Sequence, residues 1–345
     1  MITAHPVRTS ADRAIIAWLL SGCLLIFLMV IIGGITRLTQ SGLSIVEWNV
    51  VTGTLPPLNE RQWMEEFQKY QQTPEYQKLN YHFNLSDFKS IYWWEYIHRL
   101  LGRLIGLVFI IPFIYFWRKG RLTGKLVPRL ILIFALGAFQ GFLGWYMVKS
   151  GLVDRPYVSH YRLAIHLIAA FATFGFTFWV ALDEIYGYQK EKTAYRPIQV
   201  AAIVFLVVLI VQIVYGAFVA GLKAGYAYNT WPKMGDLWIA EGVTAMKPLY
   251  VNFLEGIAGV QFAHRYFAYV LALLAVLIGV FSANPRLSRR QKNGARWLVA
   301  ATGVQATLGV LTLIYAVPLT LGVVHQAGAF LLLGVNLFLL HRIRA

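Results

Sequence analysis

Cysteine and acidic residues are scarce in this sequence. Its single cysteine, Cys23, lies inside the first apolar run, so the chain can form no internal disulfide and no cysteine-based metal site. Asp and Glu number 15 against 31 Lys and Arg, which gives a formal net charge of +16. This excess does not indicate nucleic-acid binding, because no basic block lies on a polar domain that can reach a phosphate backbone.

Charged residues of either sign make up only 13% of the chain, whereas 58% of its residues are hydrophobic and the mean hydropathy is +0.58. This composition excludes an ordinary soluble domain and indicates a polytopic membrane protein. The segment up to Ser10 is too polar for a signal peptide. Apolar runs of about 20 residues predict an all-α fold with eight transmembrane helices. The predicted helices are Ala14–Ile35, Ile91–Trp117, Leu126–Val148, Tyr161–Leu182, Ile198–Gly221, Phe253–Phe281, Ala295–Tyr315 and Leu319–His341.

The basic residues gather on one side of the predicted helices. They fill the connections 118–129, 190–196 and 286–296. They also flank both ends of the chain, and Arg8 lies near the N-terminus. The positive-inside rule makes this side, with both termini, cytoplasmic. The opposite side carries two long connections, 36–90 and 222–252, and within the first we predict a helix over Asn59–Tyr76 with Asn59 as its N-cap.

A short polar segment occurs twice at the head of an apolar run. Glu95, His98 and Arg99 recur, at a constant offset, as Gln261, His264 and Arg265. On a helix, Glu95 and His98 lie about one turn apart and should meet the same ligand, whereas Arg99 should point about 100° away. The glutamate is the one member that is not repeated.

Further similarities extend the repeat. Gly33 to Leu43 resembles Gly216 to Tyr226, and Gln140 to Gly144 resembles Gln305 to Gly309. We therefore predict two four-helix units of the same orientation, residues 1–190 and 191–345, related by a pseudo-twofold axis along the membrane normal.

Each predicted unit has one histidine on its second helix and one on its fourth: His98 and His166 in the first, His264 and His325 in the second. Ionisable side chains inside a membrane are rare and usually functional. Two imidazoles that face each other across a helix bundle suit the axial ligation of a haem iron. Zinc or copper is a weaker interpretation, since these metals want more ligands, and a hydrogen bond between helices is the alternative for any single histidine. We interpret the other histidines as structural or terminal: His5, His82, His160 and His341.

These residues together resemble a known family. The segment Glu95–Arg103, its counterpart around His264 and Arg265, His166 in Ala-Ile-His-Leu and His325 in Val-Val-His-Gln closely resemble haem A synthase. The match covers essentially the whole chain. Some members carry cysteine pairs in their outer loops, and this sequence resembles the cysteine-free branch typical of proteobacteria and mitochondria.

The resemblance implies an oxidoreductase that converts the C8 methyl group of haem O to a formyl group, giving haem A for cytochrome c oxidase. It implies a haem b cofactor whose iron is held by His264 and His325. The substrate haem would lie near His98 and His166, with Glu95 beside the reacting edge. Haem O synthase and oxidase assembly factors are the implied partners. An electron donor is required that the sequence does not identify, and homo-oligomers are possible in such a protein.

The difference between Glu95 and its counterpart Gln261 agrees with a substrate site in the first half and a cofactor site in the second. Glu95 is titratable, as a site that moves protons requires, whereas Gln261 is neutral, which suffices where a cofactor is only held. Arg99 and Arg265 are candidates for pairing with haem propionates, and snorkelling to the membrane surface is an equal alternative.

Two other classes of protein compete with this interpretation. A dihaem b-type cytochrome for quinol oxidation needs two bis-histidine sites, but it places them near opposite membrane faces, whereas all four histidines here are predicted near one face. A transporter with two parallel repeats should have helices broken at mid-membrane. The apolar runs have no strong break apart from Pro112 and the turn at Pro318.

Overall fold

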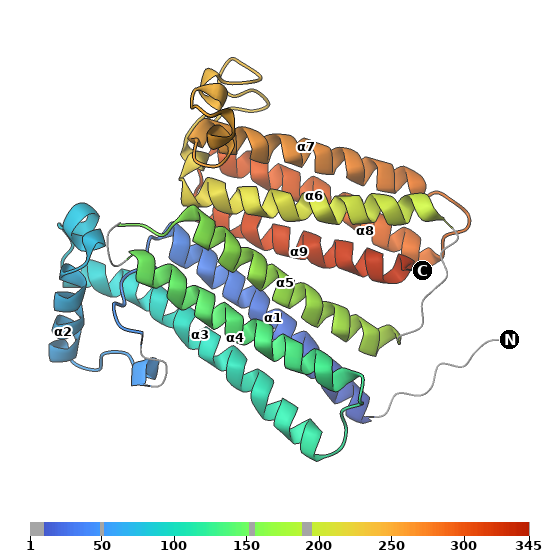
Figure 1. Cartoon of the computed structure of the whole chain (residues 1–345), viewed down its shortest axis with the longest axis horizontal. Coiled ribbons are helices and arrows are strands. Elements are labelled where there is room, and N and C mark those ends of the chain that lie inside the picture. Colours follow the sequence, from blue (N-terminus) through green and yellow to red (C-terminus); the bar gives the residue numbers. More distant parts are fainter. Residues whose placement is uncertain (1–9, 49–51, 152–155, 188–194, 345) are drawn as a thin grey trace.

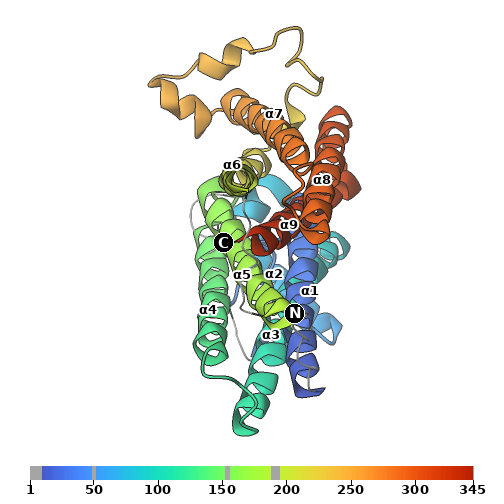
Figure 2. The same ribbon diagram turned by 90° about the vertical axis from the view of Figure 1, so that its right-hand side faces the viewer.

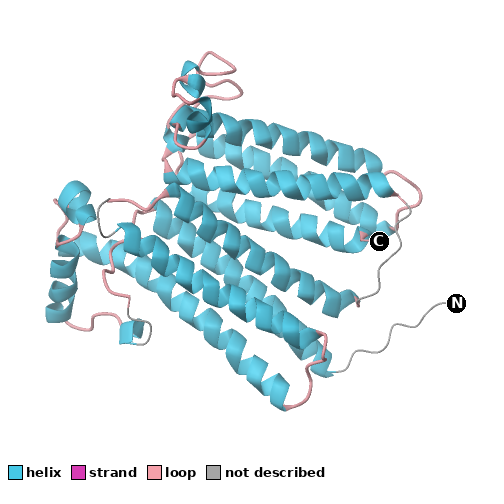
Figure 3. Cartoon of the chain, viewed as in Figure 1, coloured by secondary structure: helices cyan, strands magenta, loops and turns pink. Residues whose placement is uncertain are grey.

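A computed structural model describes residues 10–48, 52–151, 156–187 and 195–344. In these ranges the regular secondary structure is helical and there is no strand (Figures 1 and 3). Eight of the helices in these ranges are long and apolar enough to cross a membrane, as predicted. They are α1 (Ser10–Leu38), α3 (Leu85–Arg118), α4 (Leu126–Gly151), α5 (His160–Tyr186), α6 (Arg196–Gly221), α7 (Ile257–Phe281), α8 (Arg289–Ile314) and α9 (Leu319–Ile343).

The helix ends differ from the prediction where polar caps decide them. Helix α8 begins at Arg289 and not at Ala295, because Ser288 forms a capping box with Gln291. Helix α7 begins at Ile257 and not at Phe253, since Leu249–Phe253 forms a separate short helix, η5. Hydropathy locates the apolar part of a helix but not the polar turn before it.

The two halves of the chain pack in the same order. Helix α1 contacts α3, α3 contacts α4, α4 contacts α5, and α5 returns to α1; α6, α7, α8 and α9 repeat this ring. Figures 1 and 2 show the two groups side by side, and α1 and α5 meet α9 and α6 between them. The twofold axis remains a prediction, and the predicted boundary at residue 190 lies outside the described residues.

The start of α1 and the end of α9 lie at the same end of the helices in Figure 1. The opposite end carries the two long connections. This is the arrangement expected for an even number of spans. Which end faces the cytoplasm remains a prediction, and the basic residues Arg8, Lys190 and Lys192 that support it lie outside the described residues.

The first long connection folds onto α3. Helix α2 (Glu60–Gln71) begins as predicted, with Asn59 Oδ1 accepting a hydrogen bond from Gln62 N at 3.0 Å. It ends before the predicted Tyr76, because Pro74 disfavours a helical conformation at the preceding residue, and a single π-helical turn, η2 (Tyr76–Asn80), follows. An aromatic cluster fastens the connection to α3: Trp63, Phe67 and Tyr70 pack against Phe88, Ile91, Tyr92 and Tyr96.

A buried ionic cluster joins the halves at the other end of the helices. Asp183 of α5 is 1% exposed and accepts hydrogen bonds from Arg129 Nη1 at 2.6 Å and from His341 Nε2 at 3.0 Å. Arg344 Nη2 lies 2.7 Å from the same carboxylate. The interpretation of His341 as a merely terminal residue is therefore wrong, since it is buried in α9.

Candidate functional site

The four intramembrane histidines lie at matching places in the two rings. His166, His264 and His325 follow the starts of α5, α7 and α9 within about two turns, and His98 lies deeper in the longer α3. Each of the four imidazoles packs against a glycine of the neighbouring helix. The pairs are Gly33 with His98, Gly144 with His166, Gly216 with His264 and Gly309 with His325. The absence of a side chain at these glycines lets an imidazole approach the facing backbone.

The contact at Gly309 gives a testable prediction. A Cβ atom there would lie 2.9 Å from His325 Cε1, so Gly309→Ala must displace the ring. Gly303, on the same helix, has no atom within 4 Å of a built Cβ. We expect Gly309→Ala to weaken haem retention about tenfold or more and Gly303→Ala to leave it unchanged. Haem content after purification measures the difference; equal retention in both variants would contradict this role for the glycine.

The C-terminal pair has the spacing that an iron between two imidazoles requires. The ring centroids of His264 and His325 lie 6.4 Å apart, with the ring planes at 84°. Metal–nitrogen bonds of about 2 Å on each side, plus about 1 Å from nitrogen to ring centre, give roughly 6 Å. His264 Nδ1 is buried and has no hydrogen-bond partner among the described residues. The pair therefore fits a haem iron.

The N-terminal pair is built from the same parts. His98 and His166 lie within electrostatic range of each other, and the Nδ1 atom of His166 is buried without a partner in the described part of the chain. Trp48, which the sequence did not single out, covers this pair: its ring lies 3.8 Å from a Cβ built on Gly144 and 4.7 Å from the Arg99 guanidinium.

Two glutamines hold the fourth helix of each ring. Gln140 Nε2 donates to the backbone oxygen of His166 at 3.0 Å, and Gln305 Nε2 donates to that of His325 at 2.9 Å. Gln305 Nε2 also lies 3.1 Å from His325 Nδ1. Within the described ranges, no group of three or more His, Cys, Asp or Glu side chains is placed to bind a metal ion. Ligation of haem by two histidines remains a prediction.

Arg99 does not point away from Glu95 as expected. Its Nη2 atom lies 2.6 Å from Glu95 Oε1, because residues four apart share a helix face. Arg99 also donates to the backbone oxygens of Ile45 and Glu47 at 2.8 and 2.7 Å. Glu95 Oε2 accepts from Ser44 Oγ at 2.7 Å and from Ile45 N at 2.9 Å. Both side chains therefore fasten the start of the first outer connection over the N-terminal pair.

In the second half, Arg265 and the amide of Gln261 repeat the contact of Arg99 with Glu95. Arg265 donates to the backbone oxygens of Tyr228 and Thr230 and to Gln261 Oε1. Gln261 Nε2 in turn donates to the oxygens of Ala224 and Ala227. The loop offers hydrogen-bond donors to Glu95 but acceptors to Gln261, and this difference accounts for the exchange of acid and amide. Contact of either arginine with haem propionates remains a prediction.

The other histidines lie away from the two pairs. His160 is buried where α5 meets α6, and its Nε2 lies 2.9 Å from Leu254 O of the second outer connection, which supports the structural interpretation. His82 is exposed and touches its neighbours Tyr81 and Phe83. His5 lies outside the described residues.

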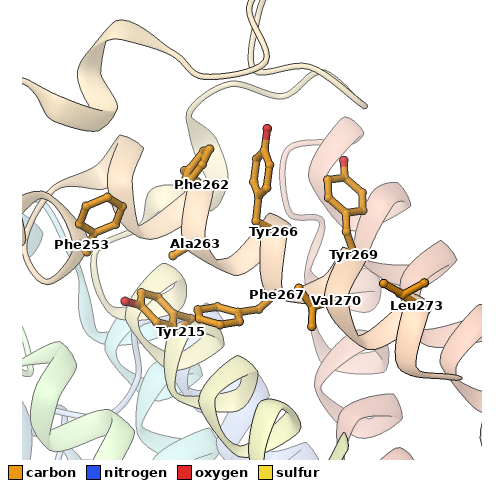
Figure 4. A pocket seen from close by; sticks show the side chains of 9 residues that line it. All are labelled: Tyr215, Phe253, Phe262, Ala263, Tyr266, Phe267, Tyr269, Val270 and Leu273. Atoms are coloured by element: carbon orange, nitrogen blue, oxygen red, sulfur yellow. The ribbon is translucent and has the colours of Figure 1, made fainter. Parts of the chain in front are cut away.

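An apolar groove on the outer wall of α7 contains none of the four histidines (Figure 4). The hydroxyl of Tyr266 donates to Trp238 O at 3.2 Å and that of Tyr269 to Pro232 O at 3.4 Å, so both are turned toward the outer connection. Such a lining suits contact with lipid near the membrane boundary. The groove is lined by Tyr215, Phe253, Phe262, Ala263, Tyr266, Phe267, Tyr269, Val270 and Leu273.

Comparison with known proteins identifies relatives of this chain over almost its full length. Residues 16–337 match the model of the COX15-CtaA family, described as cytochrome oxidase assembly protein. A Heme A synthase of Flavobacterium psychrophilum is 52% identical over 96% of this chain and 98% of its own length. One from Parvibaculum lavamentivorans is 48% identical over 97% of this chain and 96% of its own. The cysteine-free branch remains a prediction. With this identity and coverage, the chain belongs to the COX15-CtaA family, together with these Heme A synthases.

Proposed function

We propose that the protein is a haem A synthase, an oxidoreductase that converts the C8 methyl group of haem O to a formyl group. The observation that supports this most is the 6.4 Å spacing of His264 and His325, which matches an axially ligated iron. His98 and His166 lie at the corresponding places of the first half. Two histidine pairs, one beside a carboxylate and the other beside an amide, suit an enzyme in which one haem is cofactor and the other substrate.

In this proposal His264 and His325 hold haem b, which when bound supplies one-electron transfer. His98 and His166 orient the substrate haem. Its methyl group would be hydroxylated twice with dioxygen as the oxidant, each hydroxylation taking up two electrons and two protons and releasing one water. The resulting hydrated aldehyde then loses water to give the formyl group. Arg99 keeps the first outer connection closed over the site, so that bulk water is excluded.

The same proposal implies the partners of the protein and its place in the cell. The substrate haem O would come from a haem O synthase, and the product would go to cytochrome c oxidase assembly. We place the protein in the bacterial inner membrane, with both termini in the cytoplasm and both haem sites toward the periplasm, on the basis of its basic connections.

Expression in a cell that makes haem O but no haem A tests the proposal directly. Haem A in the extracted haems of such a cell supports it. A purified protein that carries only haem b, at two per chain, and yields no haem A would instead favour a dihaem electron carrier.

Glu95→Gln tests the proton-handling role proposed for this carboxylate. The amide has nearly the size of the carboxylate, and its oxygen can still accept from Ser44 and Ile45, so the change removes the charge and the ion pair with Arg99 but keeps these contacts. We expect haem content to stay within about twofold, while haem A formation falls about 100-fold and haem O or a hydroxylated haem accumulates. Normal haem A output would remove Glu95 from the mechanism.

A further inference from the structure

A second buried carboxylate lies in the outer connection that covers the N-terminal pair. Glu75, at the start of η2, is 4% exposed. Its Oε2 atom accepts a hydrogen bond from the Tyr70 hydroxyl at 3.1 Å, and that hydroxyl accepts one from Asn80 Nδ2 at 2.8 Å. Among the described residues, the other oxygen of Glu75 has no hydrogen-bond partner.

Glu75 and Glu95 have opposite environments. Glu95 lies 2.6 Å from the Arg99 guanidinium and accepts two further hydrogen bonds. Glu75 has no cation within ion-pair distance in the described ranges. Burial raises the pKa of Glu75 to about 8, and the negative charge of Glu95 acts in the same direction; the Tyr70 hydrogen bond and the charge of Lys223 oppose this rise.

A buried carboxyl group whose pKa is raised toward neutral pH is suited to acid–base chemistry. Glu75 also lies in the connection whose aromatic cluster packs on the outer turns of α3, the helix that carries Glu95 and His98. The connection thus holds a buried carboxyl group close enough to Glu95 for their charges to interact.

We propose that Glu75 is a proton relay for the N-terminal site, which rests on the proposed function of that site. Its carboxyl group gives a proton inward when the reaction there consumes one, becoming a carboxylate beside Tyr70. It then regains a proton from the outer solution, so the residue is unchanged over one turnover. The charged and titratable groups around it are Tyr70 from α2, Glu95 from α3 and Lys223 after α6.

Glu75→Gln tests the relay, because glutamine has the shape and polarity of the protonated acid and can still accept from Tyr70, but it has no proton to transfer. Glu65→Gln is the matched control: Glu65 lies on the same connection, exposed, in a surface pair with Arg61 at 3.6 Å. We expect Glu75→Gln to keep its haems and lose about tenfold or more of its haem A formation, while Glu65→Gln stays unchanged.

Infrared spectroscopy provides a readout that does not depend on activity. The difference between wild type and Glu75→Gln should show one protonated carboxyl band at neutral pH, which disappears as the pH rises through about 8. Absence of this band, or haem A formation by Glu75→Gln at the wild-type rate, would overturn the relay. A wild-type protein that shows the band but makes no haem A would overturn the relay together with the proposed function, and the band would distinguish this case from a failure at Glu75 alone.

Discussion

His264→Ala is expected to remove haem b from the purified protein. Loss of a partner that merely orients a ligand already weakens metal binding about 10–100-fold. Removing a ligand itself should therefore leave less than about a tenth of the haem b. The remaining imidazole, His325, would face a cavity in place of the ring that lies 6.4 Å away. Haem content by pyridine haemochrome and the low-spin signal in electron paramagnetic resonance measure the loss.

Two matched variants make this result specific. His98→Ala should keep haem b but lose the substrate haem, since it changes only the other ring of helices. His82→Ala, on the exposed connection, should keep both haems and full activity. Retention of haem b in His264→Ala, with the same spectrum as wild type, would show that this pair does not bind the cofactor.

Asp183→Ala is expected to destabilise the fold, because it removes the shared acidic partner of a buried ionic cluster. The carboxylate is 1% exposed and neutralises Arg129 and Arg344, which belong to different halves of the chain. Removing one partner of a buried ion pair leaves uncompensated charge and costs about 3–5 kcal/mol. Both arginines retain some solvent contact, so we expect a loss near the lower end, about 3 kcal/mol.

Thermal unfolding of the detergent-solubilised protein measures this effect. A loss of this size corresponds to a midpoint lower by roughly 6–12 °C for a chain of a few hundred residues. Asp236→Ala, which changes an exposed carboxylate on the second outer connection, should shift the midpoint by less than about 1 °C. An unchanged midpoint in Asp183→Ala would mean that the cluster does not hold the halves together.

The sequence predicted the membrane helices and the four histidines because both signals are local. A run of about 20 apolar residues has few alternatives to a membrane helix, and an imidazole inside such a run is conspicuous. The same order of helix contacts in the two halves agrees with the repeat of His98 as His264. The pairing of the four histidines around two haems remains a prediction.

The sequence did not predict contacts between segments that are distant along the chain. Arg99 was expected to point away from Glu95, yet it bonds both that carboxylate and the loop carbonyls of Ile45 and Glu47. The sequence singled out neither Asp183 nor Glu75. Their burial depends on how α4, α9 and the outer connection fold against them, which no local pattern records.

The haems themselves test the central claim most directly. Extraction of the purified wild-type protein, followed by chromatography and quantification against protein, counts each haem type per chain. We predict one haem b per chain together with haem O, haem A or a hydroxylated intermediate in the second site. Two haem b per chain and no other haem, or no haem at all, would contradict the account.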